Sequence, residues 1–331
     1  MVTGPVPTPD DAGGRSQGDD DERHFWRVRK LLVTTHSIAP TGFNWEVRRW
    51  DGWRWYDGGD GSRSRNRLAL VHLEGTTGDR LAGAVHPEGP GEAHLEVHPE
   101  HREVEAPLLD WAEAHLAAVG RPSRAPGTGE AGAERVLRVP VNDYDVHRRR
   151  LLERRGYTGT GSGGHTYRMR LAGRESEAPL LAAGYTLRSP DPADDADCQA
   201  LADLLNVAFG RTIHVAAEYR NFATRAPSYR AGLDLVALAP DGTWAAYLGV
   251  PLDGDNRLGI FEPLCTHPEH RRRGLGRALM GEAVRRLRAL GVTEVLVGTG
   301  EAMAARRTYE SAGFAEAHHW TWWERLLPAG E

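Results

Sequence analysis

Cysteine is scarce in this sequence of 331 residues. The two cysteines, Cys198 and Cys265, form no Cys-x-x-Cys pair, which argues against a disulfide framework and a structural zinc site, so no metal is expected. Long hydrophobic runs are also missing, because no stretch approaches the roughly eighteen apolar residues of a membrane span. The net charge of −5 argues against a general nucleic-acid binder. A reducing, cytoplasmic location is therefore expected.

Large apolar side chains are nearly absent from residues 1–22, which are rich in Pro, Gly and Asp. Such a segment buries too little surface to offset the entropy of ordering, so a disordered tail is expected. It has no basic region followed by an apolar one, which argues against a signal peptide. The rest of the chain is long enough for two domains.

A basic turn containing glycine separates a predicted strand, Arg257–Thr266, from a predicted helix that starts at Gly274. The first N–H groups of a helix have no partner within it, and the helix dipole is positive there, so an anion is favoured. Gly274 and Gly276 lack the Cβ atoms that would keep a phosphate from the backbone. Arg271–Arg273 add positive charge. This region therefore predicts a site for a pyrophosphate-sized ligand.

Two motifs in this half of the chain resemble those of a known family. Arg271-x-x-Gly274-x-Gly276 resembles the R/Q-x-x-G-x-G/A signature of the GCN5-related N-acetyltransferases, and Ala305–Phe314 resembles that family's late A-x-x-x-Y-x-x-x-G-F helix and strand. The resemblance covers residues 183–328 and implies acetyl-CoA, or another acyl-CoA, as co-substrate. The residues it places against CoA are Leu264, Cys265, Thr266, Arg271, Arg272, Arg273, Gly274, Leu275, Gly276, Arg277, Thr299, Ala302 and Ala305.

The resemblance also implies catalytic roles. Tyr309 stands where the family's tyrosine protonates the leaving thiolate; the alternative is that it only packs at its helix. Glu262 has the same strand parity as Leu264 and Thr266, so it either faces the thioester as a general base or is a solvated or salt-bridged strand residue. Ala302 replaces an asparagine that many members carry, so one contact to pantetheine is missing or is provided by Thr299. Weaker candidates for the base are His214, His318 and His319.

An internal repeat indicates two tandem folds. Val97–Arg102 (VHPEHR) echoes Thr266–Arg271 (THPEHR), and Leu152–Tyr157 (LERRGY) echoes Tyr309–Phe314 (YESAGF) in the same order. The first copy continues with Glu103-Val104-Glu105 and has no glycine, so its carboxylates and Cβ atoms oppose a pyrophosphate. We therefore expect a mixed α/β protein with a degenerate N-terminal domain (23–172), a linker (173–182) and a catalytic domain (183–328). This layout resembles tandem actinobacterial acetyltransferases of the mycothiol synthase type.

Tryptophan is concentrated in Phe43–Tyr56, which holds four. These residues either pack in a core or an interface, with arginines stacked on the indoles, or line a pocket for the acceptor. Three functions are compatible with the sequence. The first is N-acyl transfer from acyl-CoA to a small-molecule primary amine in a ternary complex, by a monomer or a homodimer. The second is acetylation of a protein lysine or N-terminus, and the third is acyl-CoA binding without catalysis.

Overall fold

The computed structural model describes residues 17–39, 42–56, 68–72, 80–119, 135–172 and 180–328. The chain forms two compact units, each assembled from separate segments. Unit 1 comprises Met1–Trp45, Arg63–Gly164 and His318–Glu331, and unit 2 comprises Glu46–Ser62 and His165–Ala317. Residues 1–16 of the expected tail and 173–179 of the expected linker lie outside the described residues, whereas residues 17–22 form the start of a helix. None of the described helices is long and apolar enough to cross a membrane.

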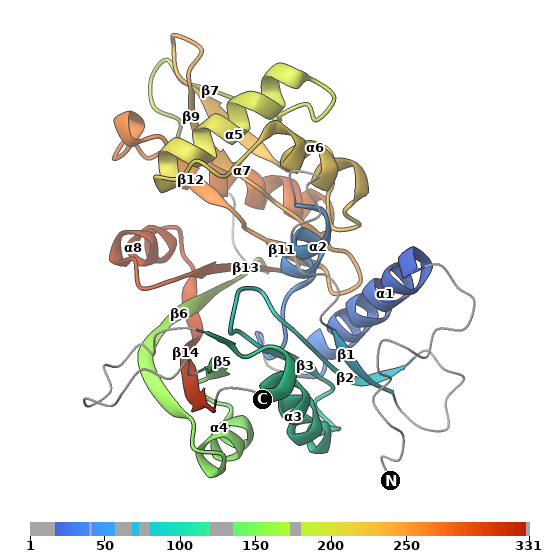
Figure 1. Ribbon diagram of the computed structural model, residues 1–331. Helices are drawn as coiled ribbons and strands as arrows, with labels where there is room; N and C mark the ends of the chain where they lie inside the picture. Colours follow the sequence, from blue (N-terminus) through green and yellow to red (C-terminus); the bar gives the residue numbers. More distant parts are fainter. Residues whose placement is uncertain are drawn as a thin grey trace. The chain divides into compact units, whose positions relative to one another are not determined.

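Unit 1 contains a three-stranded antiparallel sheet in the order β1–β2–β3 (Figure 1). All residues of the central strand are buried, because α1 and α3 both pack on it. The elements of this layer are α1 (Gln17–His36), β1 (Ala69–His72), β2 (Leu81–His86), β3 (His94–Val97), η1 (Arg102–Val104) and α3 (Glu105–His115). Helix α1 has an apolar face with Phe25, Val28 and Leu31 spaced by about one helical turn, and this face is buried.

The remaining elements of unit 1 are arranged around β5 (Arg135–Asn142), which pairs with β4 (Ala118–Val119) and with β14 (Ala315–Leu327). Helix α4 (Val146–Arg154) leads into the long strand β6 (Thr158–Arg170), which enters unit 2 at His165. Strand β14 is continuous over its whole length. No glycine or proline interrupts Ala315–Leu327, so nothing in its sequence breaks the ladder.

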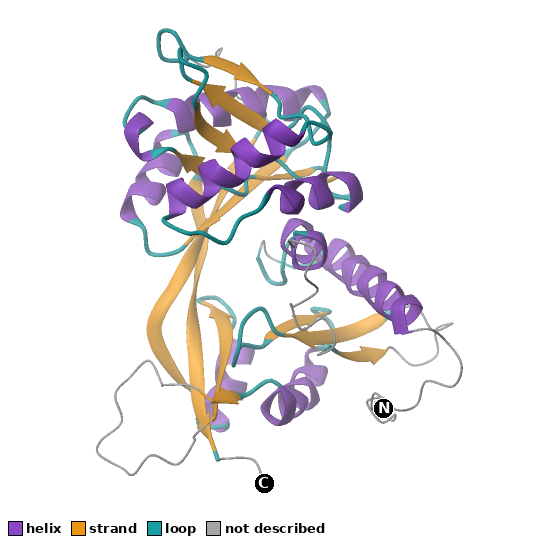
Figure 2. Cartoon of the chain, turned by 45° about the horizontal axis from the view of Figure 1, so that its top comes forward, coloured by secondary structure: helices purple, strands orange, loops and turns teal. Residues whose placement is uncertain are grey.

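Unit 2 contains a four-stranded antiparallel sheet with helices on both faces (Figure 2). Its order is β12–β9–β8–β7. Side chains of β9 alternate: Ala246 and Leu248 pack in a cluster with α7, whereas Tyr247 packs in a second cluster with α5 and α6. The elements are β7 (Thr186–Arg188), α5 (Asp195–Phe209), α6 (Ala216–Arg225), β8 (Leu235–Leu238), β9 (Trp244–Leu248), β12 (Leu264–Thr266) and α7 (Leu275–Ala289).

The strand expected at Arg257–Thr266 is divided in the structure. Its first part, β11 (Leu258–Ile260), pairs with β10 (Leu252–Asp253) and in parallel with β13 (Glu294–Thr299). Its second part is β12, which pairs with β9 instead. Pro263 lies at the break and has no N–H to continue the ladder. The chain therefore leaves β13 between Phe261 and Leu264, and β12 and β13 diverge.

Helix α2 (Val47–Trp55) comes from the N-terminal part of the sequence but belongs to unit 2. Its N-cap is Glu46, whose carboxylate accepts a hydrogen bond from the Arg49 N–H. Trp50 is fully buried and Trp53 stacks on it, with ring centroids 4.9 Å apart. These two tryptophans therefore have the packing role that the sequence suggested. The helix packs against α6.

Candidate active site

The N-terminus of α7 is free to bind an anion. Its N-cap is Gly274, in the left-handed region at φ +75°, and no side chain caps the helix. The first hydrogen bond within the helix is from the Ala278 N–H to the Gly274 carbonyl, 3.0 Å. Among the described residues, the N–H groups of Leu275, Gly276 and Arg277 therefore have no acceptor. A Cβ atom at Gly274 would meet no heavy atom within 4 Å, so open space borders these groups.

The arginines of this loop divide into two kinds. Arg271 is held by carbonyls, with Nε 3.3 Å from the Thr266 oxygen and a terminal nitrogen 2.9 Å from the Ala208 oxygen. Arg273 donates to the Tyr185 hydroxyl at 2.7 Å. Arg272 and Arg277 are exposed and have no partner within the part of the chain that the structure describes. The loop thus combines two anchored guanidinium groups with two that are free to meet an anion.

An unpaired edge of β12 lies next to this helix. The N–H of Gly249, which follows β9, donates to the Pro263 carbonyl, and the N–H of His267 donates to the Ala245 carbonyl of β9. Both bonds connect the β12 segment with β9. Because hydrogen bonding alternates along an antiparallel strand, Cys265 also faces β9, and the N–H and C=O groups of Leu264 and Thr266 point the other way. The Cys265 side chain is buried between β9 and α5, as a small packed residue. The N–H and C=O groups of Leu264 and the N–H of Thr266 thus present a free edge where β12 diverges from β13, whereas the Thr266 carbonyl accepts from Arg271.

Three elements meet at Gly276. A Cβ atom built there would lie 3.8 Å from Leu264 on β12 and 4.0 Å from Thr308 on α8 (Met303–Ser311). Ala305 on α8 is partly buried against the core of unit 2. Ala302 is the exposed N-cap of α8 and offers no side-chain cap, and Thr299 ends β13 opposite His165. The structure therefore gathers the predicted loop, strand edge and late helix in one region.

The Glu262 carboxylate lies close enough to Tyr309 to affect the pKa of its hydroxyl group. Burial, and to a smaller extent the Glu262 carboxylate, raise the pKa of Tyr309 to about 12. The Tyr309 ring is 6% exposed and packs against Tyr167 and Phe314. No described residue forms a hydrogen bond with its hydroxyl group. A protonated phenol with a free hydroxyl is suited to donate a proton to a bound ligand.

Two residues of α2 that the sequence did not single out lie beside Glu262. Arg48 Nη1 is 3.0 Å from Glu262 Oε1. Burial, followed by repulsion from the Glu262 carboxylate, raises the pKa of Glu46 well above its ordinary value. For the arginines of this stretch the sequence suggested only stacking on the indoles. No local pattern connects Arg48 with Glu262, because the two are far apart in the sequence.

The histidines considered as weaker candidates for the base have protein partners. His214 Nδ1 lies 2.8 Å from Glu218 Oε2, and its ring approaches Tyr56 edge-on at 6.3 Å. His318 packs against Tyr144, and His319 lies 3.2 Å from the Asp143 carboxylate; both belong to unit 1. Of the three, His214 alone shares unit 2 with Tyr309.

The corresponding loop of unit 1 has a different structure. A 3-10 turn, η1, runs directly into α3, with no glycine and no left-handed residue at the junction. Arg102, the counterpart of Arg271, is turned toward Glu105 at 2.7 Å and Asp145 at 2.8 Å. Glu105 is fully buried and also pairs with Arg148 at 3.1 Å. An internal ion-pair network thus takes up the arginine that binds an anion in the family motif.

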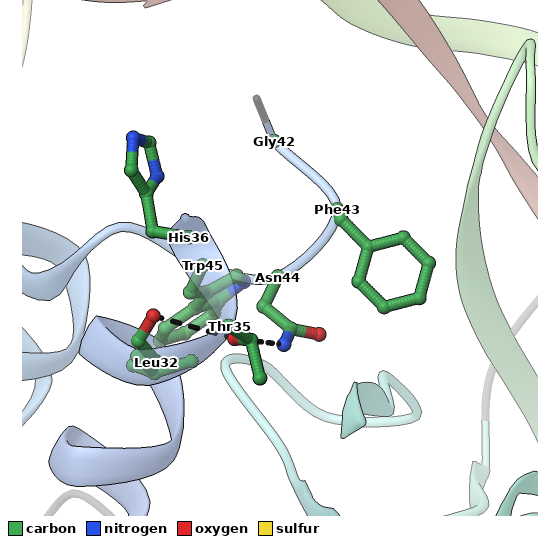
Figure 3. Close-up of a pocket in the computed structure, with 7 residues that line it drawn as sticks. All are labelled: Leu32, Thr35, His36, Gly42, Phe43, Asn44 and Trp45. Atoms are coloured by element: carbon green, nitrogen blue, oxygen red, sulfur yellow. Dashed lines mark hydrogen bonds between the residues drawn. The ribbon is translucent and has the colours of Figure 1, made fainter. Parts of the chain in front are cut away.

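Unit 1 also contains a small pocket lined by Leu32, Thr35, His36, Gly42, Phe43, Asn44 and Trp45 (Figure 3). Its polar groups bond to one another: Asn44 Nδ2 donates to Thr35 Oγ1 at 2.9 Å, and Thr35 donates to the Leu32 carbonyl at 3.3 Å. The space suits an occupant the size of a water molecule. This pocket is too small for a CoA or an amine substrate.

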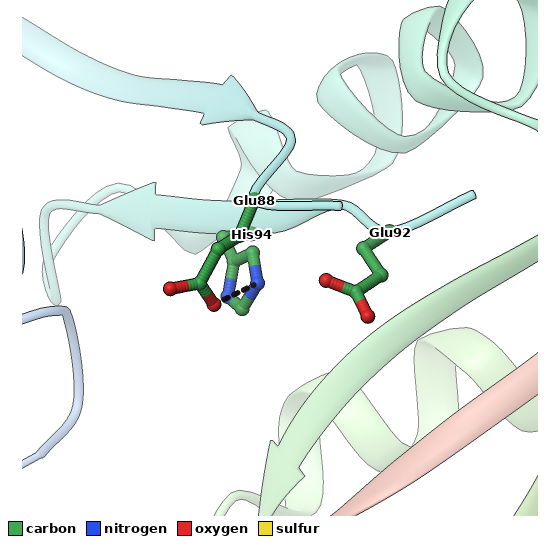
Figure 4. Close-up of side chains that lie close together, drawn as sticks. All are labelled: Glu88, Glu92 and His94. Atoms are coloured by element: carbon green, nitrogen blue, oxygen red, sulfur yellow. Dashed lines mark ion pairs between the residues drawn. The ribbon is translucent and has the colours of Figure 1, made fainter. Parts of the chain in front are cut away.

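The side chains of Glu88, Glu92 and His94 also lie together in unit 1, with potential ligand atoms within 4.8 Å of one another (Figure 4). The indole N–H of Trp45 donates to His94 Nδ1 at 3.1 Å. Because an indole N–H only donates, Nδ1 is the acceptor and His94 Nε2 carries the proton, which faces Glu88 at 3.6 Å. A protonated nitrogen has no lone pair for a metal, so this tautomer argues against His94 as a metal ligand through Nε2.

Comparison with known proteins agrees with this geometry. Residues 199–314 match the acetyltransferase (GNAT) family. No curated protein matches the chain. A tandem GNAT protein from the clavulanic acid biosynthesis pathway is 18% identical, with a TM-score of 0.62 over 96% of this chain and 98% of that one. A GCN5-related N-acetyltransferase from Sphaerobacter thermophilus is 19% identical, with a TM-score of 0.58 over 92% and 95%.

A third structure, a GNAT-family acetyltransferase from Colwellia psychrerythraea, is 11% identical and has a TM-score of 0.56 over 91% of this chain and 96% of that one. At such identities these likenesses describe the fold and not the substrate. The family match lies in the C-terminal half, as the degenerate loop of unit 1 predicts. Residues 199–314 therefore match the GNAT family, and the whole chain has the fold of a tandem GNAT protein.

Proposed function

We propose that this protein transfers an acyl group, with acetyl-CoA as the expected donor, to a primary amine of a small molecule. GNAT membership makes acetyl transfer the general activity. The observation that carries the proposal is that Gly276 lies close to both Leu264 and Thr308. This contact brings the free N-terminus of α7 next to an unpaired strand edge and to the helix of Tyr309. The exposed Arg272 and Arg277 add charge for a pyrophosphate.

The residues present fit a CoA thioester. The N–H groups at the start of α7 bind the pyrophosphate, and the edges of Leu264 and Thr266 pair with the pantetheine amides. Acetyl-CoA, when bound, supplies the acetyl group as a thioester. Glu262 takes a proton from the attacking amine, directly or through water, and Tyr309 gives a proton to the leaving sulfur. A pKa of about 12 keeps Tyr309 protonated at neutral pH.

A small acceptor is favoured over a polypeptide by the surroundings of Glu262. Arg48 and Glu46 lie against its carboxylate, so side chains of α2 take up part of the acceptor side. The Arg48 guanidinium interacts electrostatically with the Glu262 and Glu46 carboxyls. The half-exposed Glu262 carboxylate can also attract an amine in its ammonium form.

The test begins with calorimetric titration of acetyl-CoA into the full chain. Amines such as spermidine, tyramine and glucosamine, and a lysine-containing peptide with a free N-terminus, are then offered with acetyl-CoA, and products are identified by mass spectrometry. We expect acetyl-CoA binding and acetylation of small amines. Acetylation of the peptide alone would favour the protein substrate, and binding without any product would favour a non-catalytic acyl-CoA-binding protein.

A further inference from the structure

Helix α2 is an integral part of unit 2 although it ends at Trp55 and the GNAT-matched segment starts only at residue 199. Its Asp51 carboxylate accepts the backbone N–H of Ser228 at 3.0 Å, after the end of α6. The Tyr56 ring meets Phe222 of α6 at 5.8 Å. Asp51, Ser228 and Phe222 are all buried, so α2 is fixed by contacts that water does not weaken.

Arg48 is directed from this helix to Glu262. Its guanidinium lies over the rings of Tyr56 and Phe222, with centroid distances of 5.6 and 5.8 Å. The side chain is 13% exposed, whereas that of Glu262 is 42% exposed. Arg48 Nε is buried and has no partner among the described residues, so the pairing with Glu262 sets the orientation of the guanidinium.

Stability alone does not account for this pair. An ion pair with one partner nearly half exposed contributes little to folding, about 0–1 kcal/mol, because water screens it. What the pair changes is the freedom of Glu262. Glu262 lies where β11 has ended and β12 has not begun, and a half-exposed glutamate there has several rotamers available. A guanidinium that lies over the rings of Tyr56 and Phe222 holds the carboxylate in one of these rotamers.

We propose that Arg48 is a positioning residue for the transfer reaction: it holds the Glu262 carboxylate in the orientation that receives the proton of the amine. This inference rests on the proposed function. It makes α2 a necessary part of the acetyltransferase site, supplied from outside the segment that matches the family. Each Arg48 contact that supports it lies within unit 2.

The experiment uses a thiol reagent to measure the release of CoA from acetyl-CoA, with and without spermidine or tyramine. The proteins compared are the wild type, Arg48→Ala, Arg48→Lys, Glu262→Gln and the double variant Arg48→Ala/Glu262→Gln. Cys198 and Cys265 are buried, so their reaction with the reagent is slow. Arg54→Ala is the matched control, because it removes a guanidinium from the last turn of the same helix, where Arg54 lies over Trp55.

We expect Arg48→Ala to lower kcat by about 10- to 100-fold, as displaced catalytic groups do, with the Kd of acetyl-CoA unchanged. Arg48→Lys retains the charge and recovers part of the loss. The double variant is no slower than Glu262→Gln alone, because a positioning residue has nothing to position once the carboxylate is gone. Arg54→Ala retains wild-type rates.

Failure of the inference and failure of the proposed function give different results. Amine-dependent release that is equal in the wild type and Arg48→Ala, or losses that add in the double variant, would overturn the inference and leave the function standing. Release that no amine stimulates would overturn the function and the inference together, because Glu262 would then have no amine proton to receive. If Arg48→Ala no longer binds acetyl-CoA, Arg48→Lys decides. A loss of activity in Arg48→Lys that adds to that of Glu262→Gln in the double variant Arg48→Lys/Glu262→Gln contradicts the positioning role.

Discussion

The Asp51 carboxylate and the Ser228 backbone N–H, 3.0 Å apart and both fully buried, connect α2 to the segment that follows α6. A charged acceptor makes this hydrogen bond stronger than a neutral one. Because burial prevents water from replacing Asp51, the Ser228 N–H depends on this carboxylate. The bond therefore fixes the helix from which Arg48 reaches Glu262.

Asp51→Ala is expected to lower the free energy of unfolding by about 1–3 kcal/mol, because it leaves a buried N–H without an acceptor. It is also expected to lower kcat, since α2 no longer holds Arg48 firmly. Urea unfolding and steady-state kinetics measure the two effects. Asp51→Asn keeps one acceptor oxygen and is the control, with a smaller loss in both. Equal stability of Asp51→Ala and the wild type would show that α2 is held by its apolar contacts alone.

Tyr309→Phe is expected to reduce kcat by about 10²-fold or more while the Kd of acetyl-CoA stays the same, because only the proton donor is lost. The pKa of Tyr309 is raised to about 12, so the phenol stays protonated as pH rises from 6 to 10. In that range the loss is therefore expected to be constant, as measured from kcat against pH. A loss that disappears above pH 9 would instead indicate a tyrosine that ionises at its ordinary pKa.

Gly276→Phe is expected to abolish acetyl-CoA binding in calorimetry. A Cβ atom at Gly276 makes ordinary contacts at 3.8 Å with Leu264, so a small side chain is tolerated by the fold, whereas a phenyl ring extends into the space between α7, β12 and α8. Gly254→Phe, in the turn between β10 and β11 with no atom within 4 Å of its Cβ, is the control. Undiminished binding by Gly276→Phe would place the ligand elsewhere.

The parts of the site that depend on local sequence were predictable. The free start of α7 follows from Gly274 and Gly276 with an apolar helical pattern behind them, and the structure begins that helix at Leu275. The expected strand was wrong in one respect, because it is divided before Leu264. Proline at position 263 was the available signal for that break.

The rest depends on contacts between segments far apart in the chain. Glu262 was selected by its parity in a continuous strand, which the structure does not contain, although the residue still lies near Tyr309. Hydrophobic periodicity does not predict the pairing of Arg48 with Glu262. The pairing requires that α2 joins unit 2, which it does through buried contacts between distant segments, such as that of Asp51 with Ser228. Local patterns specify where a helix begins, but not which unit it joins.

The ion-pair network at Glu105 gives a prediction for unit 1. Glu105→Ala is expected to lower the free energy of unfolding by about 3 kcal/mol, because Arg148 is 5% exposed and loses its 3.1 Å partner. Glu103→Ala is the control, with a change of about 0.5 kcal/mol or less, since Glu103 is exposed.

We expect one acetyl-CoA per chain in the wild type and in both variants. The turn from η1 into α3 has no glycine, so its Cβ atoms still oppose a pyrophosphate there. Urea unfolding and calorimetry measure these quantities, and a second acetyl-CoA on the wild type would contradict the degeneracy of unit 1.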